Sequence, residues 1–284
     1  MQNLLSINNL SVVYDNVCVL NINNMNVNEG DIVGIIGQNG AGKTTLINCI
    51  LGETRFNGNI IRKFDRDEIG VQFQTNSYND LMKVNELISI VTGKRNVKKD
   101  MPDQLLKFEI MDLLNKKISS LSGGERQRLT LFLVLYLKPT VLFFDELTTG
   151  LDYEKRQKLL HVVREYSVGK TVFSVTHYFN ELEGWANKLL ILKRGTPVFW
   201  GTPEELTQKY PHYSLIKVAA SFDKYLATEC IKDINNDDIF IVAETKEQQN
   251  IITETLTEKK IVYEIKPCSI YTLYTLLMNR TQGA

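Results

Sequence analysis

The sequence predicts an α/β fold built on a parallel sheet, and three observations carry this prediction. Short apolar runs with strand character occur at Ile32–Ile36, Val141–Phe144 and Thr171–Val175. A glycine-rich turn follows the first run, and the stretch Lys43–Leu51 after it has a helical pattern. A strand, a loop and a helix in this order open an α/β architecture.

The composition excludes several classes of protein. The chain has 284 residues, of which 43% are hydrophobic and 23% charged, and its 33 basic side chains balance 33 acidic ones. This balance gives no sign of a nucleic-acid partner or of an acidic tail. The apolar runs fall far short of the roughly 20 residues of a membrane-spanning helix, and the start of the chain does not resemble a signal peptide. We expect the four cysteines, which lack metal-binding spacing, to be reduced thiols.

The first part of the chain, residues 1–210, is predicted to be one domain. Loose alternation predicts strands near its start, and apolar residues at three- and four-residue steps predict a helical subdomain over about residues 75–137. Within that subdomain, the basic stretch from Thr92 to Pro102 is expected to be an exposed loop. The remaining elements predicted here are strands at Leu4–Leu10, Val17–Met25 and Leu189–Leu192 and a helix at Tyr153–Tyr166.

Residues 211–284 have a pattern of their own and are predicted to form a small accessory α/β module. We expect strands at Ile239–Ala243 and Ile261–Ile265. The helices expected in this module are Phe222–Ile231, Lys246–Thr257 and Ile270–Met278.

A phosphate-binding loop is the clearest chemical signal. Residues 37–45 fit the pattern G-x-x-x-x-G-K-[ST], with a predicted strand before them and a helix after them. Glycines let backbone N–H groups curl around phosphate oxygens, and the helix N-terminus favours negative charge. Lys43 is expected to reach the β- and γ-phosphates of ATP, and the hydroxyl of Thr44 to bind Mg²⁺. The residues of this loop are Gly37, Gln38, Asn39, Gly40, Ala41, Gly42, Lys43, Thr44 and Thr45.

Two carboxylates end the apolar strand at residues 141–144. At the carboxyl edge of a parallel sheet, where ligands bind, Asp145 can hold Mg²⁺. Glu146 can then orient and deprotonate an attacking water molecule. An apolar strand often ends in acids that simply meet solvent, but the phosphate loop about 100 residues earlier favours the catalytic interpretation.

The segment Leu121–Arg128 identifies the family. Ser122 and Glu125 have the spacing of a capping box at the start of a helix. A capping box does not require the two glycines between them, Gly123 and Gly124, which expose N–H groups suited to an anion. This segment resembles the LSGGQ sequence of ABC ATPases, with Glu125 where glutamine is commoner.

The resemblance extends from Leu4 to about Tyr210 and implies further site residues. Tyr14 occupies the position of the aromatic residue that stacks on adenine, and Asp152, in Gly150–Asp152, that of the loop crossing the dimer interface. Gln74 matches the glutamine that senses Mg²⁺ and water, in preference to Gln72. His177 matches the histidine that contacts the γ-phosphate.

The chain departs from the family pattern at a few positions. Leu147 stands where proline is usual, which is expected to loosen the turn after Glu146, and Asn187 replaces a commoner acidic or small residue. The stretch between residues 74 and 121 is short, so the helical subdomain is expected to be trimmed. His161 and His212 match no motif and are expected to be surface or packing residues.

The resemblance implies a mechanism based on two copies of an ATPase subunit. Two ATP molecules, with Mg²⁺, lie between the phosphate loop of one copy and Ser122–Glu125 of the other in a head-to-tail dimer, which is either a homodimer or a heterodimer. ATP binding closes the dimer, and the helical subdomain passes the motion to an integral-membrane permease. The implied location is the cytoplasmic, inner face of the cell membrane, where the subunit is peripheral.

The later part of the chain resembles ATPases of bacterial drug, antibiotic and lantibiotic exporters. The resemblance lies in the segments Gly195–Pro197 and Gly201–Leu206 and in the tail, residues 211–284. We therefore predict export, or self-immunity of that type. An importer ATPase is the alternative within the family. A second alternative is a soluble ABC ATPase of translation or DNA repair, which would have two cassettes or a long coiled-coil insertion, and the sequence shows neither. A third is a module that binds nucleotide without turnover, which would not need Glu146 and His177.

Overall fold

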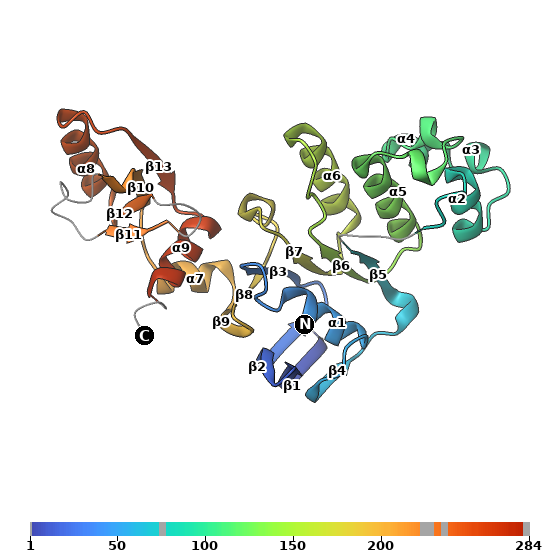
Figure 1. Cartoon of the computed structure of the whole chain (residues 1–284), viewed down its shortest axis with the longest axis horizontal. Helices are drawn as coiled ribbons and strands as arrows, with labels where there is room; N and C mark the ends of the chain where they lie inside the picture. The colour runs from blue at the N-terminus through green and yellow to red at the C-terminus, as the bar shows by residue number, and fades with distance from the viewer. Residues whose placement is uncertain (1, 74–77, 222–229, 234–237, 281–284) are drawn as a thin grey trace. The chain divides into compact units, whose positions relative to one another are not determined.

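The computed structural model describes residues 2–73, 78–221, 230–233 and 238–280. The chain divides into two compact units, which are described separately here. The first comprises Met1–His177 and Leu192–Pro197, and the second Tyr178–Ile191 and Val198–Ala284. Figure 1 labels their helices and strands.

A buried parallel sheet forms the centre of the first unit. Four of its strands lie in the order β5-β6-β7-β3, with parallel pairing throughout. Both Ile35 and Asp145 pair with Val175, so β3, β6 and β7 end at the same level. The predicted α/β class with a parallel sheet is thereby confirmed. The strands are β3 (Ile32–Gly37), β5 (Ile69–Gln72), β6 (Val141–Asp145) and β7 (Thr171–Val175).

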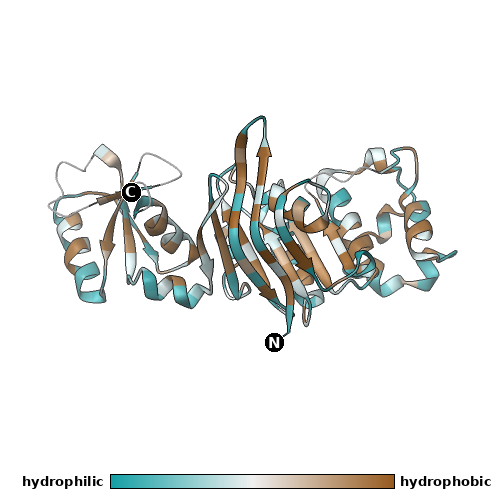
Figure 2. Ribbon diagram, turned by 90° about the horizontal axis from the view of Figure 1, so that it is seen from below, coloured by the Kyte–Doolittle hydropathy of each residue, from teal (hydrophilic) through white to brown (hydrophobic). Residues whose placement is uncertain are grey.

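The first unit also contains an antiparallel sheet of order β2-β1-β4, formed by strands from the N-terminal part of the chain. The long strands near the N-terminus alternate between hydrophobic and hydrophilic residues, as Figure 2 shows, and Leu5, Ile7 and Leu10 are fully buried. This alternation is that of a sheet with one face on the core. The strands are β1 (Asn3–Tyr14), β2 (Val17–Asn28) and β4 (Asn57–Arg62).

Several helices occur between residues 84 and 136, within the region predicted to be helical, but one expectation for this region is wrong. The stretch between Thr92 and Pro102 was expected to be a loop, yet it contains the short helix α3. The side chain of Asn96 accepts a hydrogen bond from the backbone N–H of Lys99 at 3.3 Å, and Val97 is buried, so a cap and an apolar anchor stabilise this turn. The helices of the unit are α1 (Lys43–Leu51), α2 (Val84–Thr92), α3 (Val97–Asp100), α4 (Pro102–Lys107), α5 (Gly123–Tyr136) and α6 (Tyr153–Tyr166), with short 3₁₀ turns at Arg66–Glu68, Met111–Leu113 and Ile118–Ser120.

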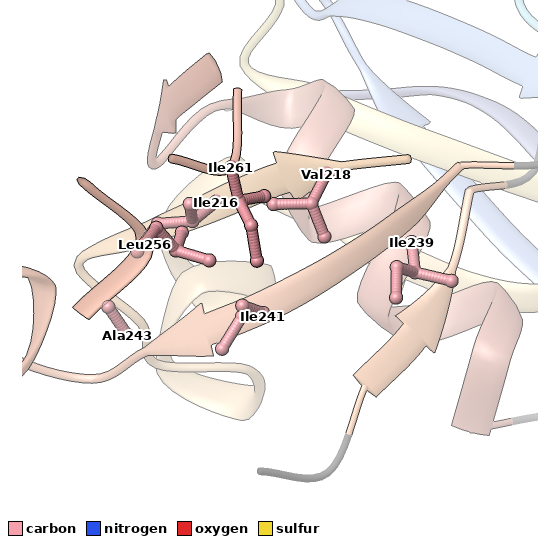
Figure 3. Close-up of a cluster of buried hydrophobic side chains, with 7 residues drawn as sticks. All are labelled: Ile216, Val218, Ile239, Ile241, Ala243, Leu256 and Ile261. Atoms are coloured by element: carbon pink, nitrogen blue, oxygen red, sulfur yellow. The ribbon is translucent and has the colours of Figure 1, made fainter. Parts of the chain in front are cut away.

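The tail contains an antiparallel sheet of order β11-β12-β10-β13. Its strands and α8 enclose a cluster of buried aliphatic side chains that includes Ile216, Ile241 and Leu256 (Figure 3). The elements are β10 (Ser214–Val218), β11 (Cys230–Lys232), β12 (Ile239–Ala243), α8 (Lys246–Glu258), β13 (Tyr263–Pro267) and α9 (Ile270–Arg280).

Two predictions for the tail need correction. Of the helix predicted at Phe222–Ile231, residues 222–229 lie outside the described part of the chain, and Cys230 and Ile231 belong to strand β11 because they pair with Ile241 and Phe240. The strand predicted at residues 261–265 begins two residues later, since residue 261 closes the end of α8 through a backbone hydrogen bond to residue 256.

The second unit begins earlier in the chain than the predicted boundary between residues 210 and 211. The ring of Phe179 packs against Tyr271 and Tyr274, with centroids 5.4 and 5.0 Å apart, and the carboxylate of Glu183 accepts the backbone N–H of Ile270 at 2.5 Å. These contacts tie residues before 210 to helix α9. The other elements around the division are the 3₁₀ turn η4 (Phe179–Glu181), β8 (Lys188–Lys193), β9 (Thr196–Gly201) and α7 (Pro203–Lys209).

None of the helices in the described part of the chain combines the length and hydropathy needed to cross a lipid bilayer.

Candidate nucleotide-binding site

Three sequence motifs meet at one edge of the parallel sheet. Strand β3 leads into the phosphate loop, β6 ends at Asp145, and His177 follows β7 by two residues. Parallel strands present their carboxyl ends at the same edge, which is where ligands bind in α/β proteins. The topology thus brings together groups that are more than 100 residues apart in the sequence.

The phosphate loop is wrapped around the ammonium group of Lys43. Its Nζ donates hydrogen bonds to the carbonyls of Gly37 (2.7 Å) and Gln38 (3.1 Å). Burial lowers the pKa of this amine, although the charges of Glu146 and Asp145 act in the opposite direction. Phosphate oxygens can replace these carbonyls as acceptors of the hydrogen bonds from Lys43. The loop is therefore suited to the phosphates of ATP.

Glycine is required at Gly42, the residue before α1. Its φ is +95°, in the left-handed region, and an added Cβ would lie 2.9 Å from the carbonyl oxygen of Val19. Helix α1 begins at the next residue, so its free N–H groups face the loop. The backbone therefore adopts the curl that phosphate binding needs.

Thr44 and Asp145 form the second part of the site. The hydroxyl of Thr44 donates to Oδ2 of Asp145 at 3.1 Å. Burial raises the pKa of Asp145, with a further contribution from the charge of Glu146, while Thr44, Lys43 and His177 oppose this shift. A hydroxyl and a carboxylate are hard oxygen ligands of the kind that Mg²⁺ takes beside nucleotide phosphates. Within the described residues there is no cluster of three His, Cys, Asp or Glu side chains that could form an all-protein metal cage.

Glu146 and His177 form the third part. Oε1 of Glu146 lies 2.6 Å from Nε2 of His177, and Oε2 accepts a hydrogen bond from the hydroxyl of Thr149 at 3.3 Å. Glu146 has a φ of +54°, a left-handed conformation that costs a non-glycine residue about 1–2 kcal/mol. Its backbone N–H donates to the carbonyl of Val175 at 2.9 Å, which holds this conformation at the strand end.

The predicted capping box at the start of α5 is present. The Ser122 side chain accepts from the N–H of Glu125 at 3.3 Å, and Oε2 of Glu125 accepts from the N–H of Ser122 at 2.8 Å. A hydrogen bond from Lys116 is the main cause of the lowered pKa of Glu125. A Cβ at Gly123 would meet nothing within 4 Å, whereas one at Gly124 would lie 3.0 Å from Leu151. The helix terminus is therefore open at Gly123.

The segment Ser122–Glu125 and the phosphate loop are separate within one chain. Among the described residues, no hydrogen bond or ion pair joins the two. Each is an anion site of its own kind, one with a lysine and the other with a free helix terminus.

Two further predicted residues are at the surface. Asp152 caps α6 by accepting the N–H of Lys155 at 3.0 Å, and the lysine's ammonium group lowers the pKa of the carboxylate. Tyr14, the last residue of β1, is 51% exposed, so its ring is available for stacking.

Gln74 lies outside the described residues. The alternative, Gln72, ends β5 with a buried side chain whose amide donates to the carbonyl of Gln127 at 3.5 Å. Sequence reasoning overlooked Gln127, whose own side chain donates to the carbonyl of Leu147, and also Thr149. Thr149 could have been found from its spacing, because it follows Glu146 by three residues. This is the spacing of a turn, and in the structure the N–H of Thr149 donates a hydrogen bond to the carbonyl of Glu146.

The two unassigned histidines form none of the contacts described above. His161 is exposed on α6. His212 is buried in the second unit, where its ring nitrogens lie 3.0 Å from the carbonyl of Tyr210 and 2.9 Å from the hydroxyl of Thr272. It is thus a packing residue, one of the two roles expected for it.

Comparisons with known proteins address the family directly. A family model described as ABC transporter matches residues 20–149. The methionine import ATP-binding protein MetN of Clostridium acetobutylicum is 30% identical over 225 residues, which cover 72% of this chain and 70% of MetN. The chain belongs to the ABC transporter family. It carries the ATP-binding domain of that family and is an ATPase of this type.

Other relatives set the limits of this assignment. The spermidine/putrescine import ATP-binding protein PotA of Mycoplasma mycoides is 28% identical over 220 residues, and the chain spans 63% of its length. A solved ATP-binding subunit of an ABC transporter has the same fold, with a TM-score of 0.66, 23% identity, and coverage of 73% of this chain and 93% of that one. The names MetN and PotA refer to import, so the comparisons do not support the predicted exporter subtype.

Proposed function

We propose that this chain is the ATP-hydrolysing subunit that powers an ABC transporter, acting with Mg²⁺ and a separate integral-membrane permease. The observation that carries the proposal is the convergence of three groups at one edge of the parallel sheet. These groups are the enclosed ammonium of Lys43, the Thr44–Asp145 pair and the Glu146–His177 pair. Together they provide phosphate binding, metal binding and a base.

In the proposed site, the phosphate loop and Lys43 hold the β- and γ-phosphates of ATP. Thr44 and Asp145, with Gln74, hold Mg²⁺, which neutralises phosphate charge when bound. Glu146 accepts a proton from the attacking water while the water oxygen bonds to the γ-phosphorus and the bond to the leaving ADP oxygen breaks. His177, which contacts the Glu146 carboxylate, orients that base and faces the γ-phosphate.

The proposed working unit is a head-to-tail dimer with two ATP molecules at its interface. Ser122–Glu125 of one copy completes the site of the other, while Tyr14 stacks on adenine and Asp152 lies at the interface. The open helix terminus at Gly123 and the lack of any bond to the phosphate loop within the described chain favour this arrangement. A second copy would add an anion site to each phosphate group.

The dimer, of identical or related chains, is proposed to sit on the inner face of the membrane and to move the permease through residues of about 75–137. Two directions of transport are considered. Export of an antibiotic, peptide or drug is favoured by the sequence of residues 195–206 and by the tail. Import is favoured by the names of the relatives MetN and PotA. Reconstitution with the permease that co-purifies with the chain, followed by transport assays on both faces of the vesicles, separates the two.

The substitution Glu146→Gln tests the proposed mechanism. Glutamine keeps the shape of the side chain but cannot take a proton, so ATP hydrolysis should fall by roughly 10² or more while ATP binding persists. With Mg-ATP, the variant should run as a dimer on gel filtration. A variant that hydrolyses ATP normally and stays monomeric would contradict both the base and the shared site.

A further inference from the structure

A pocket in the helical part of the first unit lies away from the groups described above. It opens among helices α3, α4, α5 and α6, all of which Figure 1 shows in the same part of the molecule, and its volume is about 650 Å³. All its lining residues fall between 94 and 170 and so belong to one compact unit. This volume is in the range of small-molecule sites, which is about 300–1,000 Å³.

Four aromatic rings line this aromatic pocket. Phe108 lies at the centre of the series, with ring centroids 5.5 Å from both Phe132 and Tyr166, and Phe132 continues to Tyr136 at 5.8 Å. The two phenylalanines are buried, whereas the two tyrosines are partly exposed. Phe108 and Phe132 therefore anchor the wall and Tyr136 offers ring surface to a flat ligand, whereas the ammonium group of Lys107 lies over the ring of Tyr166, 4.8 Å from its centroid.

Three lysines, Lys94, Lys138 and Lys170, surround the same pocket. Among the described residues, no carboxylate forms an ion pair with any of them, and Asp100 is the one acid in the lining. Burial lowers the pKa of the Lys170 amine, so an anion beside it would recover part of the cost of its desolvation. The pocket thus has a surplus of positive charge beside an aromatic wall.

A neighbouring pocket, lined by Lys107, Lys155 and Lys158 among others, gives an internal comparison. Each of these lysines has its own acid: Lys107 pairs with Glu165, Lys155 with Asp152 and Lys158 with Glu154, at 2.5 to 3.2 Å. Their charges are already compensated by the protein. The contrast indicates that the lysines of the aromatic pocket are available to a ligand.

We infer that the aromatic pocket binds a small planar aromatic anion, whose ring stacks on Tyr136 and whose acidic group meets Lys138 and Lys170. The rings supply dispersion and stacking, which favour flat apolar ligands. The lysines select ligands with a carboxylate, sulfonate or phosphate group over neutral ones of the same shape. This inference does not depend on the proposed nucleotide chemistry, which uses other residues.

The test uses 8-anilino-1-naphthalenesulfonate, an aromatic sulfonate that fluoresces on binding, titrated into the full chain with ADP present in excess. We expect one saturable site. Lys138→Glu and Lys170→Glu should each weaken binding by about tenfold or more, because reversed charge repels the sulfonate. Tyr136→Leu, which keeps apolar volume but removes the ring, should also weaken it. The matched control Lys158→Glu, the same charge change in the neighbouring pocket, should alter the affinity by less than about twofold.

Three results would overturn the inference. A larger loss in Lys158→Glu than in Lys170→Glu would assign the probe to the neighbouring pocket. Equal affinity for the neutral analogue N-phenyl-1-naphthylamine would show that the lysines select nothing. Binding of the probe that appears only when ADP is left out would assign it to the phosphate loop. Melting temperatures of the variants, compared with the unaltered chain, distinguish lost binding from lost folding.

Discussion

At the scale of the residue, the ammonium group of Lys43 is held by the loop that is proposed to bind phosphate. This group donates to two carbonyls of its own loop, and burial lowers its pKa. A phosphate would give the same hydrogens negatively charged acceptors, so an ion pair would replace hydrogen bonds to neutral carbonyls. The enclosed lysine is thus ready to exchange its partners for ATP.

We predict that Lys43→Ala abolishes or strongly weakens ATP binding, measured by calorimetric titration with Mg-ATP. The free energy of unfolding should change by only about 1 kcal/mol, because the loss of two hydrogen bonds is offset by the removal of a buried charge. An affinity within about twofold of the unaltered chain would rule out the phosphate-loop assignment.

His212 is a residue whose burial has a consequence for stability. Burial lowers the pKa of its imidazole, partly opposed by the carbonyl of Tyr210, so the unfolded chain binds a proton more readily than the folded one. The contribution of this neutral ring to stability is therefore complete above the unfolded pKa of about 6.5 and is lost as the pH falls below it.

Urea denaturation at pH 7.5 and pH 5.5 tests this linkage. The unaltered chain should lose more stability on acidification than His212→Gln, by up to about 1.4 kcal/mol per pH unit below the unfolded pKa. The exposed His161→Gln serves as the matched control for the removal of an imidazole. Parallel losses in the unaltered chain and in His212→Gln would show that other groups are responsible.

At the scale of the element, helix α5 begins with a capping box and an uncovered glycine. The box satisfies two of the helix's free N–H groups, while the space above Gly123 stays open. Helix α7 has the same kind of box, made by Thr202 and Glu205. Helices α5 and α7 therefore share the capping box, but only α5 has glycines at its first two positions.

We predict that Ser122→Arg blocks ATP-dependent dimerisation, because a long cation would fill the open helix terminus that the second copy's ATP is expected to meet. ATP binding to the monomer should persist. Thr202→Arg, which breaks the matching cap on α7, should lose a similar amount of stability, about 1 kcal/mol, and still dimerise. Gel filtration of both variants with Mg-ATP makes the comparison, and unimpaired dimerisation of Ser122→Arg would contradict the shared site.

At the scale of the whole molecule, the residues of the candidate site and those of the tail belong to different compact units. The described site residues lie at or before His177, in the first unit, whereas Phe179 packs on Tyr271 and Tyr274 in the second. The tail therefore shares a core with residues 178–191 rather than standing alone.

Truncation after Lys209 is predicted to leave ATP binding intact but to lower the melting temperature, because it uncovers Phe179 and removes the partner of Glu183. The ATPase rate is then measured against protein concentration. A need for higher concentration would assign the tail a role in dimerisation, and an unchanged dependence would leave it a stabilising appendage. Complete loss of ATP binding in a folded truncation would contradict the separation of the two functions.

The sequence by itself determined the local features of this protein. Helices α1 and α6 and strands β7 and β12 begin and end at the predicted residues, because their apolar periodicity and the glycines or caps beside them lie within a few residues of one another. The glycine pattern of residues 37–45 and the capping box at Ser122 were likewise readable, since each depends on spacing along the chain.

Only the tertiary structure decided what depends on residues far apart in the sequence. The 2.6 Å contact of Glu146 with His177 requires β6 and β7 to end at one level, and strand β11 exists because it pairs with β12. The boundary of the second unit was misjudged because the packing of Phe179 on α9 leaves no local signal. Backbone pairing and side-chain packing between distant segments contribute free energy that no window of sequence contains.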